Sequence, residues 1–115
     1  MKLFSYSSCS TCRRAIKWLK SNNIVFDLID ILNDPPSKEM LISASESYGD
    51  RKYILNTSGI IYRSIGSNVV KKMSDKEVFE KLSIEPRLIK RPFLYNPNKF
   101  FLVGFKEEKW AEKFL

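Results

Sequence analysis

The chain has 115 residues and a formal net charge of +7, with two cysteines and no histidine. This length fits a single domain, since domains typically contain roughly 100–200 residues. The lack of histidine excludes Ser-His-Asp triads, Cys-His dyads and histidine proton shuttles. Two cysteines cannot build a disulfide-rich scaffold. Without histidine, they are also too few to provide the four ligands of a structural zinc, so we expect no metal site.

Composition also bears on the cellular compartment. The N-terminal residues lack the apolar stretch of a secretion signal, and no apolar run approaches the roughly 18 residues that span a bilayer. We therefore expect a soluble, cytoplasmic protein that does not bind membranes and whose thiols are kept reduced.

The first third of the chain predicts a strand, a helix and a second strand. Residues 2–6 are apolar and aromatic enough for a strand. Residues 12–19 carry apolar side chains at helical spacing, and Asn22-Asn23 ends that helix. Residues 24–29 then predict a second, well-buried strand.

The middle of the chain predicts mostly helix. Pro35 and Pro36 mark a break, after which residues 37–48 have a weak helical pattern. A mixed stretch covers residues 53–65. Ser74 and Glu77 have capping-box spacing and predict the start of another helix.

The last third changes character. Residues 87–94 are a strand candidate interrupted by Pro92, residues 96–98 predict a turn, and residues 99–105 predict a strand that completes a hairpin. Residues 107–114 predict a short amphipathic helix whose early acidic side chains suit the helix dipole.

Together these elements indicate an α/β protein with a thioredoxin-like fold. The order β-α-β, helical insertion, β-β-α predicts a mixed four-stranded sheet. We expect one domain over residues 1–115, with a core over about 1–31 and 86–115 and an insertion over about 37–83.

Cys9 and Cys12 form a Cys-x-x-Cys motif in the turn between the first strand and the first helix. Free N–H groups and the macrodipole at a helix N-terminus favour an anion, and Arg13 adds positive charge nearby. Helical spacing puts Cys12 on the apolar face. Cys9 is thus the expected attacking thiolate and Cys12 the shielded, resolving thiol.

Two other interpretations of the pair remain open. Both cysteines can be structural, because cysteine packs well as a small buried hydrophobe. The pair can also share a zinc ion between two chains.

Several motifs give the chain a resemblance to a known family. These are Cys9-Ser10-Thr11-Cys12-Arg13, Arg87-Leu88-Ile89-Lys90-Arg91-Pro92, Leu102-Val103-Gly104-Phe105 followed by Glu107-Glu108, and Asn56-Thr57-Ser58-Gly59. In their order along the chain, these motifs resemble the glutaredoxin-linked arsenate reductase (ArsC) family, which includes the Spx redox regulators. The resemblance implies a thioredoxin-like core with a helical insertion.

The resemblance also implies site residues. Cys9 is the catalytic or sensing cysteine, Arg91 lies beside it, and Pro92 follows in cis. An arginine fork suits an oxyanion or a thiolate. We expect Cys9, Cys12 and Arg91 to be catalytic, and we expect the wall of the site to be formed by Ser10, Thr11, Arg13 and Pro92.

Arsenate reductases of this family place three arginines around the cysteine, and Arg91 matches one. Gly104 stands at the position of the second, and the third falls near residues 56–58, which hold no arginine. Arg51 and Arg63 lie nearby in the sequence as candidate substitutes.

These observations predict a thiol-dependent reductase, that is, a thiol–disulfide or arsenate-reductase-like oxidoreductase acting on a disulfide or an oxyanion. We expect no bound cofactor, with an external thiol system (thioredoxin, glutaredoxin or a small thiol) as the reductant. The alternative is an Spx-like redox-sensing regulator that binds RNA polymerase or another protein without catalysis.

The excess of positive charge suits solubility or attraction of anionic substrates or an acidic partner. No nucleic-acid-binding motif is present, so we expect no direct contact with nucleic acid, and we expect a monomer.

Overall fold

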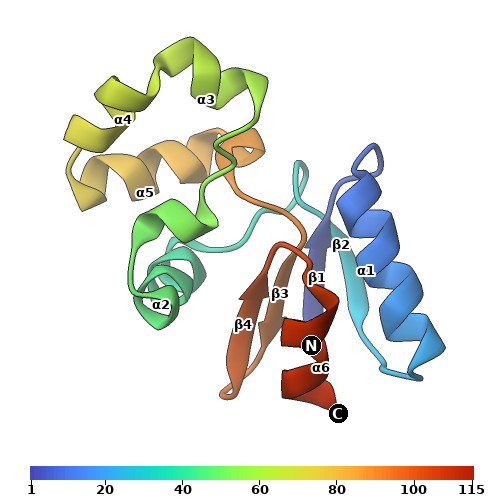
Figure 1. Cartoon of the computed structure of the whole chain (residues 1–115). Coiled ribbons are helices and arrows are strands. Elements are labelled where there is room, and N and C mark those ends of the chain that lie inside the picture. The colour runs from blue at the N-terminus through green and yellow to red at the C-terminus, as the bar shows by residue number, and fades with distance from the viewer. The chain divides into compact units, whose positions relative to one another are not determined.

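Four short strands form one mixed sheet in the computed structural model, which describes all 115 residues (Figure 1). β1 (Lys2–Ser5) pairs in parallel with β2 (Asp27–Asp30) and antiparallel with β3 (Phe93–Asn96), and β3 pairs antiparallel with β4 (Phe100–Val103). The strand order is β2-β1-β3-β4. This arrangement confirms the predicted α/β architecture with a mixed four-stranded sheet.

The chain divides into two compact units. Unit 1 contains residues 1–30 and 91–115, and unit 2 contains residues 31–90. Unit 1 holds the sheet together with α1 (Ser10–Ser21) and α6 (Glu107–Phe114). Unit 2 is helical.

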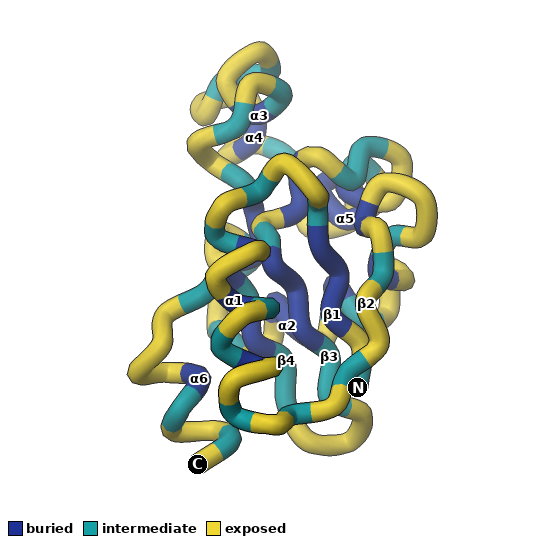
Figure 2. The backbone as a smooth tube through the Cα atoms, turned by 90° about the vertical axis from the view of Figure 1, so that its right-hand side faces the viewer, coloured by how far each residue is buried: buried dark blue, intermediate teal, exposed yellow.

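The core of unit 1 lies between the sheet and its two helices. It is formed by buried residues of three strands and both helices, namely Leu3, Ala15, Leu19, Leu94, Leu102 and Trp110. Because side chains alternate along a strand, Phe4, Phe93 and Phe101 lie on the opposite face, where their rings form edge-to-face pairs with Phe93 in the middle. In Figure 2 the tube is dark blue through the central strands.

The C-terminal helix is held to this core by Trp110. Its indole Nε1 donates a hydrogen bond of 3.1 Å to the carbonyl of Gly104. Its ring makes edge contacts with Trp18 and Phe105.

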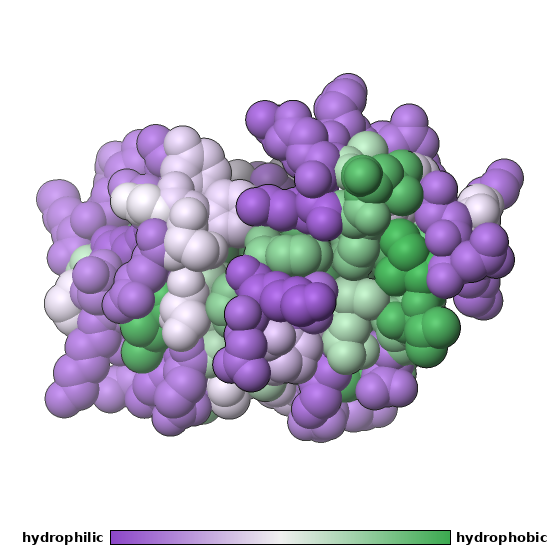
Figure 3. Space-filling view, turned by 90° about the horizontal axis from the view of Figure 1, so that it is seen from below, coloured by the Kyte–Doolittle hydropathy of each residue, from purple (hydrophilic) through white to green (hydrophobic).

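Apolar side chains also reach the surface. Viewed from below, hydrophobic area gathers to the right of centre in Figure 3. Val25 and Leu115 are each more than three-quarters exposed.

Unit 2 contains α2 (Lys38–Tyr48), α3 (Ile60–Ile65), α4 (Ser67–Lys72) and α5 (Asp75–Ile84), with the short 3-10 helices η1 (Arg51–Ile54) and η2 (Pro86–Leu88). The predicted helix starts are confirmed. Ser37 caps α2 through the N–H of Met40, and Ser74 and Glu77 form the complete capping box of α5. Gly49 ends α2 in the left-handed region, with φ of 85°, which favours glycine.

Arg51 is the main polar tie within unit 2. Its guanidinium forms an ion pair of 2.9 Å with Asp75 and donates to the carbonyls of Val70 and Met73 at 3.1 and 2.7 Å. These carbonyls belong to the C-terminal end of α4, where a cation is favourable. Arg51 therefore joins η1 to the end of α4 and the start of α5.

The predicted second strand is wrong in its bounds and in its burial. β2 begins at Asp27 rather than residue 24, and the exposed fractions of Val25 and Leu28 are 88% and 59%. The reason is its position, because β2 pairs only with β1 and forms the edge of the sheet. An apolar run alone does not distinguish an edge strand from a central one.

The predicted strand over residues 87–94 is also wrong in its first half. Residues 86–88 form η2, and Ile89 makes an isolated bridge with Leu55. The strand β3 starts at Phe93, directly after Pro92, because proline has no N–H to donate to a ladder. The sequence pattern does not indicate helix α4, which follows Gly66, because this short segment with two valines has little helical signal.

No helix of the molecule combines the length and apolar character needed to cross a bilayer.

Candidate thiol site at the start of α1

Cys9 is the N-cap residue of α1 and is half-buried. Its backbone N–H donates to the carbonyl of Tyr6 at 3.0 Å, which closes the turn after β1. Its Sγ accepts the N–H of Cys12 at 3.2 Å. The first N–H groups of a helix have no partner within the helix, so the sulfur sits where donors point toward it and solvent can still reach it.

Cys12 lies one turn further along α1 and is fully buried. The pKa of its thiol is raised from an ordinary 9.0 to about 11, mainly by burial and in addition by a hydrogen bond to Cys9 and the charge of Cys9. Both cysteines are free thiols. Cys12 therefore remains a protonated thiol at neutral pH, while Cys9 is the accessible sulfur of the pair.

Two arginines of α1 hold the turn and its first helical residues. The Arg13 guanidinium donates to the carbonyl of Ser7 at 2.9 Å, which spans the loop that carries Cys9. Arg14 donates to the Thr11 hydroxyl at 3.4 Å. Three of the expected wall residues, Ser10, Thr11 and Arg13, lie in the first turn of α1. Ser10 and Arg13 are exposed, and Thr11 is half-buried.

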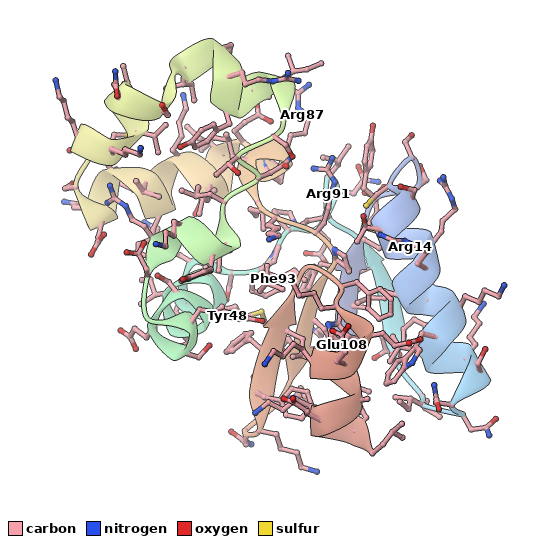
Figure 4. All side chains as sticks on the ribbon, in the orientation of Figure 1. Arg14, Tyr48, Arg87, Arg91, Phe93 and Glu108 are labelled. Atoms are coloured by element: carbon pink, nitrogen blue, oxygen red, sulfur yellow. The ribbon has the colours of Figure 1, made fainter.

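Arg91, two residues before β3, approaches the same loop, and Pro92, an expected wall residue, follows it with a fully buried side chain. The peptide bond between them is cis, as the family resemblance implied. The Arg91 guanidinium carbon lies 4.9 Å from the centre of the Tyr6 ring, and its side chain extends toward the N-terminal end of α1 in Figure 4. Because the Tyr6 carbonyl holds the N–H of Cys9, Arg91 is brought to the loop that positions the cysteine.

Tyr6 belongs to the site although the sequence motifs do not indicate it. It ends the predicted first strand, yet its ring faces Arg91 and its carbonyl accepts the N–H of Cys9. The signal available in the sequence was an aromatic residue at the end of a strand, three positions before the first cysteine.

Gly104 stands at the position of the family's second arginine, and the two candidate substitutes, Arg51 and Arg63, have partners of their own. Gly104, in the left-handed region with φ of 72°, donates its N–H to the carbonyl of Pro92 at 2.8 Å. It thus lies beside the cis-proline but provides no charge. The Arg51 guanidinium is engaged within unit 2, and Arg63 is an exposed residue whose Nε donates to the carbonyl of Gly59 at 3.4 Å.

The molecule also has no group of three or more His, Cys, Asp and Glu side chains arranged to hold a metal ion.

The strand order and the Cys-x-x-Cys turn at the start of α1 are those of the thioredoxin-like fold. The ArsC family model matches residues 4–113, and the chain therefore belongs to the ArsC family. This confirms the resemblance seen in its motifs.

Three similar proteins show the range of this family. YusI, an uncharacterized protein of Bacillus subtilis (strain 168), is 40% identical over 97% of this chain and 96% of its own length. The global transcriptional regulator Spx of Streptococcus mutans is 29% identical over 93% of this chain and 77% of its own length. A solved structure from Streptococcus mutans UA159, described as a possible arsenate reductase, has a TM-score of 0.86 at 32% identity and covers 96% of both chains.

The contact between Arg91 and Tyr6 predicts a measurable coupling. In a double-mutant cycle with Tyr6→Leu and Arg91→Met, we expect the free energy of unfolding to show a coupling of about 0.5–2 kcal/mol, the range for a cation over an aromatic ring. Urea unfolding of the four proteins measures it. Tyr6→Phe is the control and should keep the coupling, because it keeps the ring. A coupling below about 0.3 kcal/mol would show that the two side chains do not stabilise each other.

The raised pKa of Cys12 predicts its reactivity and a pH dependence of stability. In Cys9→Ser, the rate of iodoacetamide alkylation of Cys12 should have its midpoint above 9.0, because burial is the largest cause of the shift. In the unaltered protein the folded state binds more protons at Cys12 than the unfolded state between pH 9 and 11, so the free energy of unfolding should fall as pH rises through this window. The same variant in denaturant is the control. A midpoint at or below 9.0 in the folded protein would contradict the assignment.

Proposed function

We propose that this ArsC family member is a thiol-dependent reductase of disulfides, with Cys9 as nucleophile and Cys12 as resolving thiol. One observation carries the proposal: within a single helical turn, one cysteine is accessible at the N-cap and the other is buried with a raised pKa. Two thiols in such different surroundings suit two different steps of one exchange reaction.

The reaction proceeds in two displacements. The Cys9 thiolate attacks one sulfur of a substrate disulfide, forms a mixed disulfide and releases the other half as a thiolate. Cys12 then gives up its proton to the departing thiolate and attacks the Cys9 sulfur, which forms the Cys9–Cys12 disulfide and releases the second half as a thiol. Two electrons have left the protein, and an external thiol system returns them in the reducing cytoplasm.

Arg91 acts on the substrate side of the site, next to the cis peptide bond that joins it to the buried Pro92. Arg91 stabilises negative charge on the attacking or departing sulfur, since a guanidinium offers fixed donors to an anion. The half-exposed Arg91 lies at the Cys9 loop, whereas Gly104 beside Pro92 provides no further cation. A disulfide, which needs fewer charge-assisted donors than an arsenate oxyanion, is therefore the substrate class best supported.

Trapping tests the mechanism directly. Cys12→Ala removes the resolving thiol, so we expect Cys9 to accumulate as a mixed disulfide with its substrate when cells make the variant. Non-reducing gels followed by mass spectrometry identify the attached protein or small thiol.

Two variants control the trapping experiment. Cys9→Ser should trap nothing, and the unaltered protein should release its partners by forming the Cys9–Cys12 disulfide. Purified Cys12→Ala that forms no adduct with a low-molecular-weight disulfide would refute the role of Cys9 as a nucleophile.

A second candidate function is a redox-sensing regulator that binds RNA polymerase. The likeness to the Spx regulator of Streptococcus mutans over 93% of the chain favours it. In this function the Cys9–Cys12 disulfide changes the affinity for a protein partner, and no substrate is turned over.

Binding to purified RNA polymerase tests this second function. We expect a regulator to bind with affinities that differ at least tenfold, or about 1.4 kcal/mol, between the dithiol and disulfide forms. Surface plasmon resonance of both forms provides the measurement. A Cys9→Ser/Cys12→Ser double variant is the control and should not respond to oxidant. Failure to bind in either form would exclude this function.

A further inference from the structure

The solvent-facing side of α1 carries an unusual concentration of positive charge. The helix contains Arg13, Arg14, Lys17 and Lys20 and no acidic residue among its 12 residues, and all four basic side chains are exposed. Arg13, Lys17 and Lys20 are spaced i, i+4 and i+7, which puts them on one face. That face lies opposite the apolar stripe of Cys12, Ala15 and Leu19 that packs into unit 1.

These charges are not neutralised within the molecule. None of the ion pairs of the structure involves α1, and the two guanidinium groups donate to a carbonyl and a hydroxyl instead. The other helices of eight or more residues differ, because α2, α5 and α6 all contain acidic residues as well as lysines. The exposed side of α1, on which Figure 4 labels Arg14, therefore carries only positive charges between Arg13 and Lys20.

The position of this surface relates it to the thiol chemistry. From Arg13 to Lys20 the helix rises about 10 Å, and Arg13 itself spans the loop of Cys9. An acidic segment lying along α1 would therefore hold a neighbouring disulfide next to the accessible sulfur. Surface charge of one sign raises the rate at which an oppositely charged partner arrives by roughly 10- to 1000-fold.

We propose that the exposed face of α1 is the docking surface for an acidic protein whose disulfide exchanges at Cys9. The proposal rests on the reductase function above and identifies its substrate as a protein disulfide flanked by Asp or Glu side chains. A protein is favoured over a nucleic acid because the surface begins at a thiol, and only a partner that carries sulfur can react there. The reaction at this surface consists of the same two thiol–disulfide displacements described above, and it needs no further oxidant or reductant.

The test compares two peptide disulfides that differ only in charge. Each peptide has one cysteine, activated as its mixed disulfide with pyridine-2-thiol, and four flanking residues that are Glu in one peptide and Gln in the other. Release of pyridine-2-thione gives the second-order rate constant for attack by Cys9. At low ionic strength we expect the Glu peptide to react about tenfold faster than the Gln peptide. Its advantage should disappear near 1 M salt, where the Debye length is about 3 Å.

Charge-reversal variants locate the effect. Lys17→Glu/Lys20→Glu should abolish or invert the advantage of the Glu peptide and leave the rate with the Gln peptide unchanged. Lys71→Glu/Lys72→Glu is the matched control, because it makes the same change in net charge at two exposed lysines in the last turn of α4. That control should retain most of the advantage. If the first variant unfolds, as judged by circular dichroism, Lys17→Gln/Lys20→Gln replaces it.

The outcomes separate the surface from the chemistry. If neither peptide reacts with the unaltered protein, the reductase function fails. If both react at equal rates, or if both charge-reversal variants lose the preference alike, the function stands and the α1 surface is refuted. A competition experiment tests for a nucleic-acid surface, with random-sequence double-stranded DNA and polyglutamate as inhibitors of the reaction between Cys9 and the Glu peptide. If DNA inhibits at a lower concentration of negative charges than polyglutamate, the proposal is overturned in favour of nucleic acid.

Discussion

The N-terminal turn of α1 is the constraint on which the rest of the site depends. The first N–H groups of a helix lack partners within it, and here the N–H of Cys12 is satisfied by the sulfur of Cys9. The chain leaves β1 in a tight turn that is closed by the hydrogen bond from the N–H of Cys9 to the carbonyl of Tyr6. Arg13 of the helix spans the same turn through its hydrogen bond to the carbonyl of Ser7. Arg91 reaches the same turn through the Tyr6 ring. Each contact therefore also fixes where the accessible sulfur lies.

Burial provides the difference between the two thiols. Cys12 belongs to the apolar stripe of α1, so its side chain is removed from water together with Ala15 and Leu19. An ionised sulfur is unfavourable there, which is why the pKa of Cys12 is raised. Cys9, one turn earlier, precedes the stripe and keeps contact with solvent. Helical periodicity thus assigns different environments to two chemically identical residues.

Charge is distributed by the same periodicity. The stripe of α1 that faces the core leaves the opposite side for Arg13, Lys17 and Lys20, and the absence of acidic residues makes this side positive. In unit 2, by contrast, Arg51 is used to join helix ends and contributes little to the surface. The excess of positive charge in the composition is therefore found in at least two settings, one at helix ends within unit 2 and one on the exposed face of α1.

The sequence alone determined the helix over residues 12–19, the capping box at Ser74 and the Cys-x-x-Cys turn, because these depend on neighbours within one or two helical turns. Only the tertiary structure decided that residues 27–30 form an exposed edge strand and that Tyr6 meets Arg91, which is 85 positions further along the chain. Strand pairing and contacts across a sheet join residues that are distant in sequence, and no local pattern of polar and apolar side chains encodes which strand will be outermost or which ring an arginine will face.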